Sequence, residues 1–459
     1  MKTSAPLAST LGSVCAMKRL TELSGWGRHP VLPAELRLSD DLESITSEAS
    51  LSRGMGRAYG DAALPGAAGA VVAGTTKAVR VIEFDRDTGV LRAQAGLSLE
   101  ATHDLVLPAG WSCPVLPGTQ FVTLGGMVAA DVHGKNHHVA GTIGAHVRGL
   151  RVRVADGRIL EIGPDQEAEL FYATIGGMGL TGHILDVELQ LERIPSSWIE
   201  QETEAAGDLE DLLRRLRAAS AEWPMTVAWS DGLCGGGGLG RGILIKGRWA
   251  GADRIPAAPW RRGRRVSIPI SLPGWTPRRS LVRVMNTAYY HRHRVTAGAS
   301  VVSPMPFFHP LDVVGHWNRF YGRNGFTQYQ CVLPGPDAEL ACRGIFEYLA
   351  RHRAGPLLAV IKDFGAEGAG TLSFPMAGIT LSLDLPIRSR RTHDLVAGMN
   401  ERVANANGRI YLAKDALSDA VAFRRMETRL DEFNAVRDRW DPDRRLRSAL
   451  SVRLMGDPA

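Results

Sequence analysis

Apolar and polar residues alternate with a period of two along much of the first 195 residues, which predicts strands and loops there. Asp156-Gly157 stands between two such runs, and an Asp-Gly pair in that position is a strong hairpin signal. The run from Asp85 to Gly89 is a weaker signal of the same kind. We therefore predict two hairpins and one further strand, at residues 79–84 with 90–95, 150–155 with 158–162, and 187–191.

After Pro195 the pattern changes, because helical periodicity and isolated strand-like runs replace the dense alternation. Residues 208–221 are charged and repeat with a helical period, and residues 420–440 predict a long amphipathic helix ended by Asp441-Pro442. Strands are predicted at 329–333, 358–362 and 379–383. The chain therefore reads as an α+β protein of two domains that meet near residue 195.

Composition excludes several classes of protein. With 459 residues, 44% apolar and 22% charged, the chain is an ordinary globular protein. Its five cysteines are scattered, so neither a disulfide framework nor a cysteine metal cluster is expected. The net charge of +6 suits an anionic ligand but is no nucleic-acid signature, and no nucleic-acid partner is expected. Residues 1–20 make a poor signal peptide and no apolar run approaches membrane-spanning length, so we expect a cytoplasmic protein.

The segment from Arg53 to Asp61, RGMGRAYGD, is the first candidate binding loop. Its three glycines allow consecutive backbone N–H groups to turn inward and hold phosphate oxygens. The spacing matches neither the dinucleotide fingerprint nor the phosphate loop of nucleotide triphosphatases. Taken alone, the segment is equally compatible with a structural turn.

A second loop runs from Leu116 to His138, and a third, GGMGLTG, covers residues 176–182. Gly125-Gly126 opens a run of small residues that would let the backbone approach a flat ligand. The cluster of His133, Lys135, His137 and His138 could bind a metal, line a loop or belong to a cofactor site. We favour the cofactor site and expect no metal.

Together these loops resemble the FAD domain of flavoenzymes of the vanillyl-alcohol-oxidase type, and more narrowly the decaprenylphosphoryl-β-D-ribose 2'-oxidase family. Later segments continue the resemblance in order, at 307–312, 317–322, 328–330, 372–375 and 411–415. It implies an FAD-binding domain of residues 1–195 completed by 410–459. It also implies a substrate domain of residues 196–409, with an antiparallel sheet over the isoalloxazine and a C-terminal region like that of D-arabinono-1,4-lactone oxidases.

The resemblance implies FAD as cofactor, held by residues of all three loops and of the C-terminal part. These residues are Arg53, Gly54, Met55, Gly56, Arg57, Ala58, Tyr59, Gly60, Asp61, Pro117, Gly118, Thr119, Thr123, Leu124, Gly125, Gly126, Ala129, Ala130, His133, Gly134, Asn136, Gly179, Gly182, Ile184 and Tyr411. Covalent relatives carry a tethering His where this chain has Arg57, so we expect the flavin to be bound non-covalently.

The implied activity is oxidation of a secondary hydroxyl of a sugar to a ketone. The family points to a polyprenyl-phosphate-linked ribose, with a separate NAD(P)H-dependent keto-reductase completing an epimerisation. A soluble sugar, alditol or aminoglycoside-type substrate is the alternative within enzymes. A non-catalytic flavin-binding protein is the alternative of another class.

Oxidation of an alcohol needs a base within reach of the hydroxyl proton. The resemblance places Lys414 beside flavin and substrate, so Lys414 is the first candidate, followed by Tyr59 and His133. Each could instead only make hydrogen bonds within the loops. The residues implied for the substrate side are Phe308, Gln328, Gln330, Lys362, Ser382 and Lys414.

Alternation places Gln328 and Gln330 on one strand face, and their amides suit sugar hydroxyls, unless that face is merely solvated. Lys362 has the same alternative, an exposed strand end. Two positions depart from the family: Ser382 replaces the Cys of the mycobacterial enzymes, and Phe308 stands where Tyr is expected. The Arg-rich stretch 254–294 could contact a phosphate-bearing lipid substrate or a membrane surface, but a solvated loop is favoured.

Overall fold

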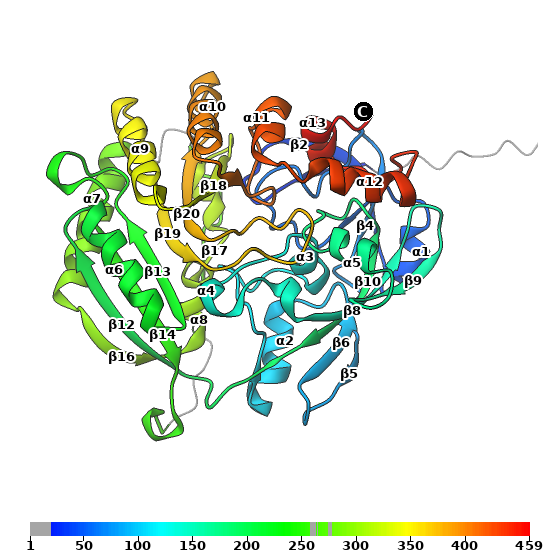
Figure 1. Ribbon diagram of the computed structural model, residues 1–459, viewed down its shortest axis with the longest axis horizontal. Helices are drawn as coiled ribbons and strands as arrows, with labels where there is room; N and C mark the ends of the chain where they lie inside the picture. The colour runs from blue at the N-terminus through cyan, green and yellow to red at the C-terminus, as the bar shows by residue number, and fades with distance from the viewer. Residues whose placement is uncertain (1–19, 258–262, 264, 274–277) are drawn as a thin grey trace, which may run out of the picture.

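The computed structural model describes residues 20–257, 263, 265–273 and 278–459, so the segment considered above as a signal peptide lies almost wholly outside the described residues. Figure 1 shows two halves side by side. The half on the right is built from the N-terminal sheets and the last helices of the chain. The half on the left is built around one large sheet.

Two sheets form the N-terminal half, with strand orders β1-β2-β4-β3 and β5-β6-β10-β8-β9. Their strands are β1 (Thr21–Ser24), β2 (Val31–Leu38), β3 (Leu51–Arg53), β4 (Val71–Gly74), β5 (Val81–Phe84), β6 (Val90–Gln94), β8 (Val147–Arg153), β9 (Ile159–Ile162) and β10 (His183–Gln190). Both predicted hairpins are present as β5–β6 and β8–β9, each antiparallel. The Asp85 carboxylate accepts from the N–H groups of Asp87 and Thr88, which fixes the first turn.

An eight-stranded sheet of order β16-β12-β14-β13-β19-β20-β18-β21 forms the other half, and all its neighbouring pairs are antiparallel. Its strands are β12 (Ile199–Ala206), β13 (Met225–Ser230), β14 (Gly242–Trp249), β16 (Gly298–Val302), β18 (Phe326–Pro334), β19 (Ala359–Phe364), β20 (Gly378–Pro386) and β21 (Arg409–Ile410). The three predicted strands overlap β18, β19 and β20, with the second beginning one residue before β19, so the expected antiparallel sheet is confirmed. Two short strand pairs belong to none of these sheets. They are β7 (Trp111–Ser112) with β11 (Glu192–Arg193), and β15 (Val266–Ser267) with β17 (Val314–Gly315).

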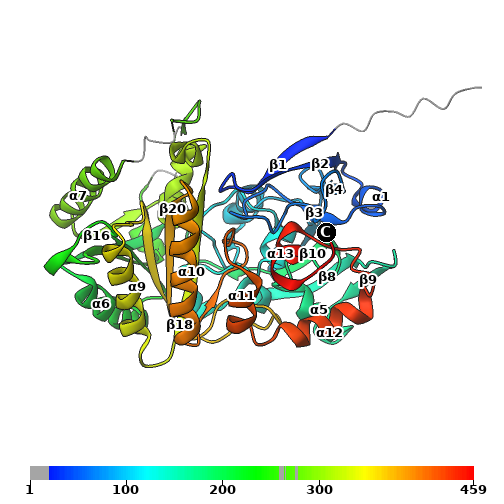
Figure 2. The ribbon, with the colours of Figure 1, turned by 90° about the horizontal axis from the view of Figure 1, so that it is seen from above.

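Helices α6, α9 and α10 lie along one face of the large sheet (Figure 2). The predicted helix is present as α6 (Leu209–Glu222), where Asp208 caps the N-terminus by accepting from the N–H of Asp211. The opposite face of the strands nearest β21 is turned toward the N-terminal half. The helices are α1 (Leu42–Thr46), α2 (Leu99–Val106), α3 (Leu124–Ala129), α4 (His137–Ala140), α5 (Ala168–Thr174), α6, α7 (Arg279–Val295), α8 (Pro304–Phe308), α9 (Ala338–Arg351), α10 (Arg390–Asn405), α11 (Ala420–Met426), α12 (Leu430–Trp440) and α13 (Ala449–Met455).

Two predictions about helices are wrong. The C-terminal amphipathic helix is two helices, α11 and α12, because Glu427 leaves the helical conformation. Beside this break, Arg429 pairs with Glu427 and with Glu367. Within the Arg-rich stretch, residues 279–295 form helix α7 rather than a solvated loop. Val282, Asn286 and Tyr290 give α7 a buried face that the abundance of Arg and His masks in the sequence.

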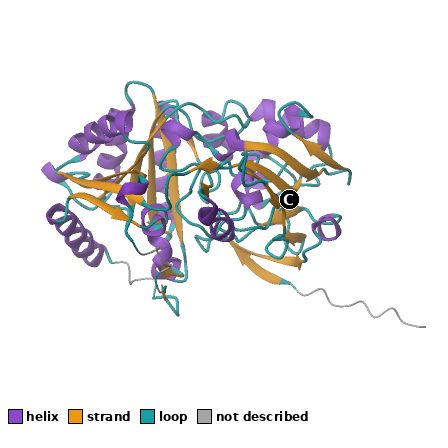
Figure 3. Ribbon diagram, turned by 90° about the horizontal axis from the view of Figure 1, so that it is seen from below, coloured by secondary structure: helices purple, strands orange, loops and turns teal. Residues whose placement is uncertain are grey.

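After α10 the chain returns through β21 to the N-terminal half, where α11, α12 and α13 pack, as the orange-to-red segment of Figure 1 shows. One continuous apolar core runs through both halves. Figure 3 shows the strands of the two halves meeting at loops, which is where the candidate site lies. None of the described helices combines the length and the apolar character needed to cross a bilayer. The exact domain limits, 195 and 410, stay predictions.

Candidate active site

The first glycine-rich loop begins where β3 ends at Arg53. The backbone N–H groups of residues 55–58 donate no hydrogen bond to any group in the described part of the chain, so they are free to hold an anion. The Arg53 guanidinium turns under the loop and donates to the carbonyl oxygens of Ala63 and Ser24. This Arg therefore supports the loop from below.

Two glycines bring distant segments against this loop. A Cβ at Gly60 would stand 1.9 Å from the carbonyl oxygen of Asp415, and one at Gly54 would stand 2.4 Å from Oγ1 of Thr123. Neither approach leaves room for a side chain. The loop consequently touches both the N-terminus of α3 and the segment that carries Lys414.

The second loop is built around α3, whose N-terminus Thr123 caps by accepting from the N–H of Gly126 at 3.2 Å. Gly125 packs so closely on the end of β6 that a Cβ would lie 2.8 Å from that of Ala95. Thr119 donates to the Asp312 carboxylate at 2.9 Å, which ties this loop to the other half of the molecule.

The polar face of the large sheet carries the predicted substrate-side residues. Gln328 lies opposite Asp384 in the ladder and Gln330 opposite Ser382, while Lys362 lies opposite Thr380. Because the side-chain period is two, all these side chains point to the same face. Gln328 and Gln330 are 6% and 4% exposed, so the alternative of a solvated strand face is excluded for both.

Lys414 lies where this face meets the first loop. Its ammonium group donates a short hydrogen bond to Oε1 of Gln328 and lies 4.0 Å from the ring centroid of Tyr59. Burial lowers the pKa of Lys414 to about 8, although the nearby Asp384 carboxylate opposes that shift. An amine of this pKa is substantially neutral near pH 8 and can accept a proton.

Tyr59 and His133 are poorer proton acceptors. Burial, and after it the charge of Asp384, raise the pKa of Tyr59 well above its usual range, so the phenolate is disfavoured. Burial and the neighbouring Lys362 hold the pKa of His133 well below its usual range, so it stays neutral and weakly basic. His133 Nε2 lies 3.0 Å from the amide nitrogen of Gln330, which makes it a hydrogen-bond acceptor within the site.

Two further lysines converge on the same region. Lys135 donates to the carbonyl oxygens of Phe307 and Phe308, and burial lowers its pKa to about 7. Lys362 is half-buried rather than exposed, and burial together with the charges of Lys414 and Lys135 lowers its pKa to about 7. Such a cluster of cations favours binding of an electron-rich ligand.

Several predicted residues have a structural environment instead. Asp61 pairs with Arg453 at 2.7 Å, and Ile184 and Gly182 pack in the interior near β8. The Tyr411 hydroxyl donates to the carbonyl of Ala130 at 2.8 Å.

Phe308 is buried against Trp249, and Lys135 lies near both its carbonyl oxygen, at 3.5 Å, and its ring, 5.9 Å from the centroid. Asn136 donates to the carbonyl of Pro114. The contacts of Phe308 and Asn136 stabilise the loops. The contacts of Ile184 and Gly182 do not place them at the polar face of the large sheet.

Sequence reasoning missed Asp384. Its carboxylate accepts from Gln328 and from the hydroxyl of Tyr321, the latter at 2.7 Å, and burial raises its pKa to about 6. The resemblance singled out Ser382, and strand alternation places Asp384 on the same face, two residues further along. That signal was available in the predicted strand 379–383, which stopped one residue short of Asp384.

The residues present fit a flavin dinucleotide. The free N–H groups of residues 55–58 suit a pyrophosphate, and a buried Nε of Arg57 and a buried Nδ1 of His133 have no partner in the described structure. In the same described ranges, no group of three or more His, Cys, Asp or Glu residues could hold a metal ion. A flavin dinucleotide would thus run from the first loop toward His133 and Lys414.

This fold and this site are those of an FAD-dependent oxidoreductase acting on CH–OH groups. A family model described as an FAD binding domain matches residues 46–163. The chain belongs to the decaprenylphosphoryl-β-D-ribose oxidase family, since it is 33% identical to that enzyme of Mycolicibacterium smegmatis over 94% of this chain and 97% of the relative.

Two other relatives are similar to this chain over different shares of its length. An uncharacterized protein of Streptomyces coelicolor is 33% identical over 78% of this chain and 100% of its own length. A D-lactate dehydrogenase of Archaeoglobus fulgidus is 33% identical over 24% of this chain and 25% of its own. The similarity therefore extends through nearly the whole chain only for the first relative of the three.

Proposed function

We propose that the protein oxidises the 2'-hydroxyl of a ribose carried on a polyprenyl phosphate, giving the 2'-ketone. The long similarity to the mycolicibacterial decaprenylphosphoryl-ribose oxidase supports this substrate class. The observation that carries the chemistry is the position of Lys414, between the first glycine-rich loop and the polar face of the sheet.

Removal of hydrogen from an alcohol separates into a hydride and a proton. FAD, when bound, supplies the two-electron acceptor for the hydride. Lys414, with a pKa of about 8, accepts the hydroxyl proton as the carbonyl forms. Gln328 keeps the amine in place through their hydrogen bond, and the Asp384 carboxylate stabilises the ammonium that results.

Gln330 and Lys362 are proposed to hold the sugar. The Gln330 amide nitrogen contacts His133 Nε2 and donates to Oγ1 of Thr380 at 3.1 Å, so the amide oxygen is left to accept from a sugar hydroxyl. Ser382 lies directly opposite Gln330. A serine hydroxyl there can hydrogen-bond to a sugar hydroxyl, whereas the cysteine of mycobacterial relatives could do so only weakly.

The ketone product calls for a second enzyme. We propose that a separate NAD(P)H-dependent keto-reductase reduces it on the opposite face, so that the pair inverts the 2'-carbon. Incubation of the oxidised product with NADPH and a candidate reductase, followed by sugar analysis, should give arabinose from ribose. Recovery of ribose alone would remove the epimerisation from the proposal.

Anaerobic titration tests the proposed substrate. The purified yellow protein is mixed with farnesylphosphoryl-ribose, free ribose, ribitol and a neutral farnesyl riboside, and flavin absorbance is followed. We expect bleaching by farnesylphosphoryl-ribose and formation of a 2'-ketone. Bleaching by free ribose or ribitol in its place would favour a soluble substrate, and absence of bleaching by every compound would favour a flavin binder without this activity.

A further inference from the structure

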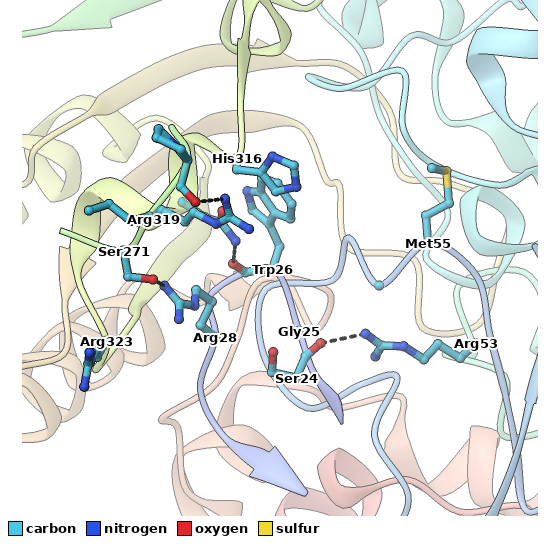
Figure 4. A pocket seen from close by; sticks show the side chains of 14 residues that line it. Ser24, Gly25, Trp26, Arg28, Arg53, Met55, Ser271, His316, Arg319 and Arg323 are labelled. Carbon is cyan, nitrogen blue, oxygen red and sulfur yellow. Dashed lines mark hydrogen bonds between the residues drawn. The ribbon is translucent and has the colours of Figure 1, made fainter. Parts of the chain in front are cut away.

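A cavity of about 710 Å³ lies at the outer end of the first loop. Figure 4 shows Arg53 and Met55 on one side of this cavity and Arg28 and Arg319 on the other. Met55 and Gly56 belong to the loop whose N–H groups suit the pyrophosphate, so the cavity is part of the expected FAD site. Helix α7 lies outside that site, and its surface has a feature that FAD binding leaves unexplained.

The outer side of α7 carries a row of apolar side chains that are open to solvent. Leu281, Val284, Met285 and Val295 are 45%, 66%, 51% and 86% exposed, and Ala288 is exposed as well. Positions three, four and seven residues apart share one side of a helix, so these five residues form one stripe. We call them the α7 stripe.

The other side of α7 attaches the helix to the large sheet. Val282, Asn286 and Tyr290 are buried there, and Asn286 donates to the Asp231 carboxylate at 3.0 Å. The ring of Tyr289 lies against that of Trp229 on β13, with their centroids 4.7 Å apart. The helix therefore packs through one side while the nearly opposite side is apolar and exposed. A continuous exposed apolar surface of this kind indicates a contact with another apolar body.

Positive charge accompanies the α7 stripe. Five exposed arginines lie on the helix or at its N-cap, namely Arg278, Arg279, Arg283, Arg292 and Arg294. The sequence has no Asp or Glu between Asp253 and Asp312, so the helix itself carries no negative charge. A body that covers the stripe is therefore favoured if its surface is anionic.

The α7 helix lies on the same face of the large sheet as the candidate active site. Trp229 lies opposite Val360 in the ladder, and Lys362 is two residues further along β19, so all three point to one face. Helices α6, α9 and α10 cover the other face (Figure 2). A body in contact with the α7 stripe is thus on the side of the sheet to which the polar face turns.

We propose that the α7 stripe docks the protein on the surface of a membrane that contains anionic lipids. The apolar side chains enter the boundary between headgroups and acyl chains, and the arginines contact the lipid phosphates. A second copy of the chain suits the stripe less well, because two-fold pairing of α7 with itself would set five arginines against five. This inference goes beyond the proposed function, whose polyprenyl-linked substrate would be met at the same surface.

Sedimentation of the FAD-loaded protein with lipid vesicles tests this proposal. One set of vesicles contains two parts phosphatidylcholine to one part phosphatidylglycerol, and the other contains phosphatidylcholine alone. We expect binding to the anionic vesicles, weakened by added salt, and little binding to the neutral ones. Val284→Glu should weaken binding by roughly 10-fold or more, because an apolar side chain is lost from the contact and a repelled charge is added. Leu340→Glu, at an exposed apolar position of α9 on the other face of the sheet, is the matched control and should bind like the wild type.

Each other result has a distinct meaning. Val295→Glu, at the end of α7, is a second variant in case Val284→Glu is poorly folded, with flavin content as the check on folding. Wild-type binding by both variants would overturn the docking surface, as would a wild-type protein that sediments with neither kind of vesicle. Equal binding to neutral and anionic vesicles would overturn the role of the arginines. A wild-type dimer that Val284→Glu converts to a monomer in light scattering would assign the stripe to a contact between copies instead.

This test is independent of the proposed oxidation, because vesicle binding requires no sugar. If the anionic vesicles bind the protein as expected but farnesylphosphoryl-ribose fails to bleach the flavin, the docking surface stands and the proposed oxidation fails. If the flavin is bleached but no vesicle binds, the oxidation stands and the docking surface fails.

Discussion

At the scale of single residues, the proposed chemistry depends on the Lys414 amine, which burial makes less basic. Lys414 lies between the amide of Gln328 and the ring of Tyr59, with Asp384 behind Gln328. The other two candidate bases are held in protonation states that suit them less, Tyr59 as the neutral phenol and His133 as a weakly basic imidazole. We therefore propose that one side chain, Lys414, accepts the proton.

Replacement of Lys414 tests that assignment. We expect Lys414→Met to keep its fold and its FAD while the rate of flavin reduction by substrate falls by ~10²–10⁴-fold, as on loss of a general base. Stopped-flow absorbance measures the rate. Lys77→Met, at an exposed lysine after β4, is the matched control and should react normally. A yellow Lys414→Met protein reduced at the wild-type rate would exclude Lys414 as the base and direct attention to Tyr59→Phe.

The pH dependence gives a second test of the same residue. Burial lowers the pKa of Lys414 to about 8, and only the neutral amine can accept a proton. The rate of flavin reduction should therefore be small well below pH 8, rise tenfold per pH unit there, and level off above it. A rate that instead falls as the pH rises through 8 would show that the ammonium form is the active one.

The two glutamines on β18 provide a prediction about binding. Gln330→Ala should raise the apparent substrate constant by roughly 5–150-fold, since one or two hydrogen bonds to the sugar are lost from a buried position. Gln166→Ala, at an exposed turn after β9, serves as control. Because Gln328 also holds Lys414, Gln328→Ala should lower the maximal rate as well. Unchanged constants in the double variant would rule out a role for this face in substrate binding.

Arg57 underlies the prediction that FAD is not covalently attached. Its guanidinium lies over the rings of Trp26 and Phe121, at 3.9 Å and 5.0 Å from their centroids, and a guanidinium does not form the flavin bond that a tethering histidine forms. Acid precipitation should leave the yellow colour in the supernatant. Colour retained in the washed pellet would contradict the prediction.

At the scale of elements, helix α13 connects the first loop to the segment of Lys414. Arg453 on α13 pairs with Asp61 at 2.7 Å and with Asp415 at 2.8 Å, and both carboxylates are nearly fully buried. The C-terminal helices thus hold the loop that would bind FAD against the residue that would take the proton. That arrangement makes the end of the chain part of the site.

Loss of this contact should cost stability. Arg453→Met leaves two buried carboxylates unpaired, so we expect a loss of about 3 kcal/mol or more in the free energy of unfolding and weaker FAD binding. Arg439→Met, which breaks an exposed pair with Glu169, should change the free energy of unfolding by less than about 1 kcal/mol. Urea unfolding of the two variants decides the matter. Equal stability of Arg453→Met and wild type would show that the pairs contribute nothing.

Sequence patterns predicted elements where one local rule dominates. Alternation and an Asp-Gly turn were sufficient for β8–β9, and a capped helical period for α6. The break between α11 and α12 was not predicted, because the helical period of the sequence continues through it, and the Arg429–Glu367 contact beside it joins residues 62 apart in the chain. The pairing of Gln328 with Asp384 likewise depends on the register of two distant strands.

The glycine-rich loops illustrate the same limit within the site. Their sequences indicate a phosphate cradle, but the contacts of Gly60 with Asp415 and of Gly54 with Thr123 arise only when three remote segments meet. The resemblance to known flavoenzymes implied that these segments belong together. From its residues alone, the first glycine-rich loop was as compatible with a structural turn as with a phosphate-binding loop.

At the scale of the whole molecule, the two halves contribute different chemical groups to the region where they meet. The N-terminal half offers free backbone N–H groups in the first loop, and the large sheet offers a buried polar face with three lysines of lowered pKa nearby. The arrangement fits the proposed reaction, in which the first loop holds the cofactor, the polar face holds the sugar and Lys414 takes the proton.

Anaerobic single-turnover reduction with deuterated substrate tests the central claim most directly. Farnesylphosphoryl-ribose carrying deuterium at the 2'-carbon is compared with the same compound deuterated at the 3'-carbon, and flavin bleaching is followed. We predict bleaching that is several-fold slower with 2'-deuterium and unchanged with 3'-deuterium, because the bond to hydrogen at the 2'-carbon is the one that breaks. Slower bleaching with 3'-deuterium alone, or no bleaching by either compound, would contradict 2'-oxidation by this protein.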